Sequence, residues 1–60
     1  MTISLARFDW IIVKAGASRL LTPWERQFID GLAARRQRLG DRLKISEEQE
    51  LKLEEIARRT

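Results

Sequence analysis

The chain has 60 residues and a formal net charge of +3, with twelve Lys and Arg against nine Asp and Glu. A domain this small buries only about 60% of the surface that its unfolded chain exposes, so a partner or a second copy would help to stabilise it. It contains no cysteine and no histidine, which excludes a disulfide framework, zinc sites and histidine-based acid–base chemistry.

The longest uninterrupted apolar run is Trp10-Ile11-Ile12-Val13, far too short to cross a membrane. The N-terminus also lacks a basic region that leads into a cleavable apolar segment. The sequence therefore predicts a soluble, cytoplasmic protein with no membrane contact.

The first segment, residues 1–15, has patterns of both a helix and a strand. A helix would start near Thr2 or Ser4, stop before Gly16, and be apolar around most of its surface. Its two apolar stripes would be Leu5, Phe8 and Ile12 on one side and Ala6, Trp10 and Val13 on the other. The β-branched run from Ile11 to Val13 would suit a strand, which would need a second copy or a partner to pair with. We favour the helix, because nothing else in the sequence has the pattern of a strand.

The strongest local signals define a central helix over residues 23–39. Thr22 and Glu25 form a capping box, and Pro23 occupies the first helical position, where its missing N–H costs nothing. Gly40 stands where a left-handed C-cap belongs. The predicted packed stripe is Trp24, Phe28, Leu32 and Leu39, with Ile29, Ala33 and the stem of Arg36 beside it. Gly31 falls on this side, and we interpret it as a position where another backbone crosses closely.

Ser46 and Gln49 form a second capping box, which opens a last helix over residues 47–59. Its predicted packed stripe is Gln49, Leu53, Ile56 and Thr60, with Ala57 beside it, and Leu51 points away. The short connector makes the two long helices antiparallel neighbours. The sequence thus predicts one all-α domain over residues 1–60, a small three-helix arrangement built on an antiparallel αα-hairpin.

Few residues could carry chemistry. The carboxylates of the last helix have no histidine or cysteine beside them, and we interpret them as one solvated face: Glu47, Glu48, Glu50, Glu54 and Glu55. No serine has a base to activate it, and no glycine-rich phosphate loop occurs. The sequence therefore predicts a protein that is not an enzyme and binds no cofactor or metal.

Two surfaces could bind a partner. Large apolar side chains of the first segment exceed what the hairpin can cover, which favours protein binding through Phe8, Trp10, Ile12 and Val13, or burial of the tryptophans in the core of a homodimer. A basic patch could contact phosphates or an acidic surface: Arg35, Arg36, Arg38, Arg42 and Lys44. The same charges would also complement the dipole of the central helix.

The pattern Leu21-Thr22-x-Trp24-Glu25-x-x-Phe28, followed by Ile45-Ser46-x-x-Gln49-x-x-x-Leu53-x-x-Ile56, resembles a helical hairpin of short phage and mobile-element proteins. The resemblance covers about the last forty residues and carries over no functional residues, because its positions are caps and core. It implies an accessory protein that blocks host machinery, as anti-CRISPR proteins do. We therefore expect a non-enzymatic, phage-type inhibitor of a host protein complex. The alternative is a small basic protein that binds nucleic acid or regulates transcription.

Overall fold

The computed structural model describes residues 2–60 and contains three α-helices. They are α1 (Leu5–Gly16), α2 (Pro23–Leu39) and α3 (Glu47–Arg59), and a short 3-10 helix, η1 (Gly40–Arg42), follows α2. No strand occurs among residues 2–60, so the predicted all-α class is confirmed and the strand alternative for the first segment is wrong.

Local hydrogen bonds determine where each helix begins. Ser4 caps α1 through its hydroxyl. In α2 the backbone N–H of Glu25 donates to the Thr22 hydroxyl at 3.1 Å, and the backbone N–H of Thr22 donates to the Glu25 carboxylate at 3.0 Å. Ser46 and Gln49 exchange the same two bonds at the start of α3. Both predicted capping boxes are present, and each satisfies amides that have no partner inside the helix.

The end of α2 depends on Gly40, whose φ is 57° and ψ is −131°. The predicted C-cap requires a positive φ, which glycine adopts at little energetic cost. The ψ, however, is not that of a left-handed helical residue, and the chain turns directly into η1. The connector then passes inward, because the side chains of Leu43 and Ile45 are buried in the core.

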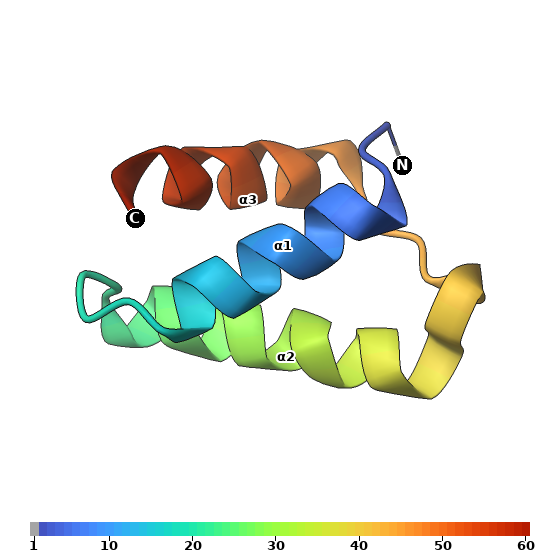
Figure 1. Ribbon diagram of the computed structural model, residues 1–60, viewed down its shortest axis with the longest axis horizontal. Coiled ribbons are helices and arrows are strands. Elements are labelled where there is room, and N and C mark those ends of the chain that lie inside the picture. The colour runs from blue at the N-terminus through green and yellow to red at the C-terminus, as the bar shows by residue number, and fades with distance from the viewer. Residues whose placement is uncertain (1) are drawn as a thin grey trace.

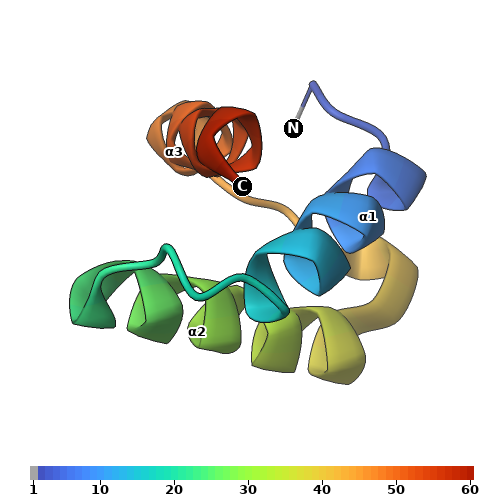
Figure 2. The same cartoon turned by 60° about the vertical axis from the view of Figure 1, so that its left-hand side comes forward.

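The two long helices run in opposite directions, and α1 lies diagonally across them on one side of the pair (Figure 1). A second view shows the same arrangement nearly along the axis of α3 (Figure 2). Close backbone packing joins α1 to α2 and α1 to α3. The core side chains are Phe8, Ile11, Ala15, Ile29, Leu32, Leu43, Ile45, Leu53, Ile56 and Ala57. The hairpin is thus held together largely through α1.

Long charged side chains bridge α2 and α3 directly. The carboxylate of Glu25 is almost entirely buried and forms an ion pair with the guanidinium of Arg59. The amine of Lys52 lies 3.7 Å from the same carboxylate and 5.4 Å from the ring centre of Trp24. Because both cations come from α3, Glu25 serves as the cap of α2 and also as the link between the two helices.

The packed face of α2 matches the predicted stripe at Ile29 and Leu32, and partly at Phe28 and Leu39, but not at Trp24. Glu25, Ile29 and Leu32 are buried, whereas Trp24 is 59% exposed. Adjacent residues on a helix point about 100° apart. Since Glu25 is held inward by the Thr22 N–H and the cations of α3, Trp24 points to the flank of α2 instead of the core.

The interpretation of Gly31 was therefore wrong. It is exposed, and a Cβ added there would meet no atom within 4 Å beyond its chain neighbours and its own helix backbone. Gly31 lies two turns after Trp24 and shares its exposed flank, which lies beside the buried face of α2. No other backbone within residues 2–60 crosses α2 at that position.

The carboxylates of α3 do not form one solvated face, because Glu50 is only 5% exposed. Its carboxylate accepts hydrogen bonds from the backbone N–H groups of Thr2 and Ile3, the latter at 2.8 Å, and from the Thr2 hydroxyl at 3.1 Å. These bonds lower the pKa of Glu50, the bond from Ile3 most strongly. The packed face of α3 is consequently turned from Gln49 toward Glu50, while Leu51 points away, as predicted.

Candidate binding surfaces

The four residues of α1 that were predicted to bind a partner differ in how much of each side chain is exposed. Phe8 is wholly buried in the core, so its assignment as a contact residue is wrong. It lies on the face of α1 that packs against both other helices, which the sequence pattern alone could not select. Val13 is 73% exposed and Trp10 is 50% exposed, while Ile12 is half-buried.

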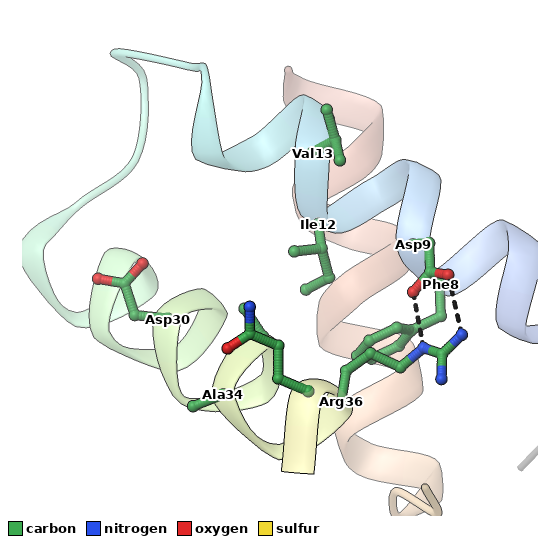
Figure 3. Close-up of a pocket in the computed structure, with 9 residues that line it drawn as sticks. Phe8, Asp9, Ile12, Val13, Asp30, Ala34 and Arg36 are labelled. Carbon is green, nitrogen blue, oxygen red and sulfur yellow. Dashed lines mark hydrogen bonds and ion pairs between the residues drawn. The ribbon is translucent and has the colours of Figure 1, made fainter. Parts of the chain in front are cut away.

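Ile12 and Val13 line an open groove of about 470 Å³ between α1 and α2. Figure 3 shows Ile12 projecting from α1 toward α2 and Val13 above it on α1 at the rim, with Phe8 beneath the groove. The opposite wall comes from the exposed half of α2 and includes Ala33, Ala34 and Gln37. The small alanines keep this wall low, so the groove can admit side chains of another molecule.

The groove has a different charge environment on its two sides. On one side the carboxylate of Asp9 accepts two hydrogen bonds from the guanidinium of Arg36, at 2.9 and 3.1 Å. This pairing lowers the pKa of Asp9 and raises that of Arg36. On the other side lies Asp30, which has no ion pair within residues 2–60 (Figure 3). An apolar ligand with a positive charge at one end would match this arrangement.

Trp10 lies on the α3 side of α1 and does not line the groove. The guanidinium of Arg7 and the amine of Lys14 lie 4.9 and 4.8 Å from its ring centre. Arg7 also pairs with Glu54 at 2.9 Å, which lowers the pKa of that carboxyl, and Lys14 donates to the carbonyl of Ala57. The exposed indole is therefore held by cations that tie α1 to α3.

A second groove, of about 520 Å³, lies between α2 and α3. Its α2 wall consists of Trp24 and Phe28, whose rings stack with 5.4 Å between centroids. Its α3 wall is polar and includes Glu48 and Lys52. Sequence reasoning missed this groove because it placed both aromatic side chains in the core. The available signal was Glu25, whose place in the capping box with Thr22 sets its direction, and the buried face of α2 lies on its side of the helix.

The predicted basic patch is only partly available. Arg36 is taken up by Asp9 and lies 3.7 Å from Asp41, and Arg35 donates to the backbone carbonyl of Lys44 at 3.0 Å. The side chains of the patch that are exposed and have no acidic partner within residues 2–60 are Arg38, Arg42 and Lys44. The structure thus leaves a smaller cationic cluster around the end of α2.

The described part of the chain holds no group of three or more acidic, cysteine or histidine side chains arranged to bind a metal ion. None of its helices combines the length and the apolar character that a membrane span needs. No family model, curated protein or solved structure matches the chain. The fold and its surfaces therefore define the class: a small three-helix protein with two open grooves.

Proposed function

We propose that this chain is a non-enzymatic binding protein that docks on another protein through the groove between α1 and α2. The observation that carries this proposal is the exposure of Val13 beside Ile12 at the edge of a preformed, largely apolar groove. Apolar surface of this kind is typical of sites that bind proteins. A volume of about 470 Å³ can receive a few apolar side chains of a partner.

The charges at the groove suggest the chemistry of the partner segment. Asp30 is exposed and has no cationic partner within residues 2–60, while Asp9 is already paired with Arg36. A partner helix or loop with apolar anchors and a Lys or Arg near Asp30 would satisfy both features. An acidic segment would meet Asp30 with like charge.

We further propose that docking inhibits a larger host protein complex. A protein of this size presents one small surface, and it would act by covering a contact that the complex needs. The resemblance to short phage proteins favours this mode of action over a scaffold that joins two partners.

The experiment compares Val13→Glu with Leu51→Glu. Both side chains are exposed apolar residues on helices, at 73% and 69%, but Leu51 points away from the groove. Glutamate is a good helix former, so both variants should fold. Each tagged variant is used to capture proteins from lysate of the natural host. Affinity for the captured complex, and its inhibition, should fall at least about tenfold for Val13→Glu because a partner would desolvate the new charge.

The Leu51→Glu variant should bind and inhibit like the wild type. Equal effects of the two substitutions, or none, would remove the groove from the proposal. Capture of a complex whose activity does not change would reject the inhibitory role and keep the binding role.

A second candidate function is binding of nucleic acid, favoured by the exposed cations at the end of α2, Arg38, Arg42 and Lys44. Arg42→Gln combined with Lys44→Gln should then weaken binding to DNA and reduce the salt slope by about 0.9 per lost phosphate contact. Arg19→Gln with Arg58→Gln removes the same charge from exposed positions elsewhere and is the control. Fluorescence anisotropy with duplex and single-stranded DNA at two salt concentrations separates the candidates. No binding near physiological salt would reject this function.

A further inference from the structure

One flank of α2 carries a regular set of side chains that the core does not use. Trp24, Phe28, Gly31, Arg35 and Arg38 recur at helical spacing, and all lie within a narrow sector beside the packed face, with Phe28 at its edge packed partly against the core. Trp24 and Phe28 form a stacked aromatic pair that is open to the second groove. The flank therefore has an aromatic half before Gly31 and a cationic half after it.

Gly31 stands at the centre of this flank and makes no close contact within residues 2–60 that would require a glycine. A glycine in a helix interior costs about 1 kcal/mol relative to alanine. Its φ is not positive, and the space around its Cα is open. A position of this kind allows a helix of another molecule to approach the backbone of α2 closely.

We propose that a second copy of this chain covers the flank, with two α2 helices antiparallel and crossing at Gly31. A twofold axis at that point would place the aromatic half of each α2 against the cationic half of the other. Trp24 would then lie near Arg38 of the second copy, and Phe28 near Arg35. Arginine beside exposed aromatic surface is a favourable contact, and the symmetry makes every contact twice.

The polar wall of the second groove supports the same occupant. Glu48 lines the groove and has no ion pair within residues 2–60, while Arg38 is exposed and also lacks an acidic partner. The antiparallel crossing brings the cationic half of one copy to the groove that holds Glu48 of the other. This surface therefore carries both the cation and the anion that it needs to pair with a second copy of itself. Binding to an unrelated partner would not require both charges on one surface.

This inference goes beyond the proposed function and uses the opposite flank of α2 from the groove with Val13. It also moves the predicted homodimer contact from α1 to α2. Binding of a partner protein in the first groove and pairing through the second flank can therefore be tested separately.

Sedimentation velocity over a range of concentrations tests the dimer with Gly31→Leu and Gly16→Leu. Gly16 is also exposed, has no positive φ and has open space, so the two variants carry the same change in matched surroundings. Gly31→Leu should keep a folded monomer but raise the dimer dissociation constant at least about tenfold, because the new side chain separates the helices. Gly16→Leu should dimerise like the wild type.

A charge exchange provides the second measurement. Arg38→Glu should weaken the dimer, because it places two carboxylates opposite each other. Adding Glu48→Lys should restore much of the lost affinity, because positions 38 and 48 then carry opposite charges again, with the signs exchanged. A wild type that remains monomeric at high concentration overturns the proposal. The proposal is also overturned if Gly31→Leu leaves the dimer dissociation constant unchanged, or if Gly16→Leu raises it as much as Gly31→Leu does. Loss of the dimer in Val13→Glu alone would overturn it as well.

Discussion

α1 contributes fully buried side chains such as Phe8 and Ile11 to the core that all three helices share, whereas α2 and α3 are also bridged by charged side chains at their flank. The first contact excludes water and depends on shape. The second depends on a single buried carboxylate, Glu25, and on two cations that are partly exposed. Burial in this small protein is thus concentrated around one short helix, and the longer helices keep open flanks that can bind other molecules.

The largest effect should come from the buried contact. Phe8→Ala removes a ring at the centre of the core and should destabilise the protein by about 3–5 kcal/mol. That is comparable to the whole stability expected for a domain of this size. Urea denaturation followed by circular dichroism should show a largely unfolded variant. Trp24→Ala should cost only about 1 kcal/mol, because its side chain is mostly exposed. Equal losses of stability in the two variants would contradict the difference between the buried contact and the open flank.

The link between α2 and α3 should be weaker but measurable. Glu25→Gln keeps an acceptor for the Thr22 N–H and leaves Arg59 and Lys52 without their shared charge. We expect a loss of about 1–2 kcal/mol, reduced by the exposure of the cations. Thermal unfolding should show a midpoint lower by roughly 5–10 °C.

Glu55→Gln is the control for this change. Glu55 also pairs with Lys52, at 3.6 Å, but it is exposed and serves no cap. Its replacement should leave the midpoint almost unchanged. A similar loss in both variants would mean that burial of Glu25 adds nothing to the link.

Acid should act mainly on the contacts of α1 and of the segment before it. The pKa values of Asp9, Glu50 and Glu54 are lowered in the folded chain, by the Arg36 guanidinium, by backbone N–H groups and by the Arg7 guanidinium respectively. A lowered pKa means that the folded state favours the charged form, so this stability is complete above the ordinary values of 3.8 and 4.5. It is lost as pH falls from about 4.5 through the folded values.

Thermal unfolding between pH 7 and pH 2.5 measures this loss. Glu50→Gln should lower stability at pH 7 and make the acid dependence shallower, because one titrating group has been removed. Glu47→Gln changes an exposed carboxylate without an ion pair within residues 2–60 and should leave the curve as it is. A curve for Glu50→Gln as steep as that of the wild type would contradict the role of this carboxylate.

The smallest effect is expected on the open flank of α2. Gly31→Ala should raise the stability of the dilute monomer by up to about 1 kcal/mol, because alanine is the better helix former and meets no atom there. The sequence interpretation of a close crossing within the chain implied a loss instead. Gly40→Ala is the contrasting variant and should destabilise, since its φ of 57° suits glycine. Chemical denaturation at low concentration should show the two opposite signs.

Local chemistry made the helix boundaries predictable. Thr22 with Glu25, and Ser46 with Gln49, exchange hydrogen bonds across three residues, so their geometry does not depend on the rest of the fold. Gly40 ends α2 for an equally local reason, its positive φ. The all-α class and the antiparallel order of α2 and α3 follow from these short-range signals and the brief connector.

The candidate site was predictable only in part. Excess apolar surface on α1 pointed to Val13 and Ile12, and both line the first groove. The wall supplied by α2 was not predictable, since Ala33, Ala34 and Asp30 carry no distinctive pattern. The second groove was missed because aromatic side chains at helical spacing usually indicate a core.

The sequence by itself determined where α2 and α3 begin and where α2 ends, because those boundaries rest on bonds between residues three or four positions apart and on the positive φ of Gly40. Only the tertiary structure decided which face of each helix is buried. The position of α1 across both long helices turned Phe8 inward and left Val13 outside, and the ion pairs between α2 and α3 turned Glu25 inward and left Trp24 outside. Such choices depend on contacts between distant residues, where a shift of one position rotates a helix by about 100° and exchanges core for surface.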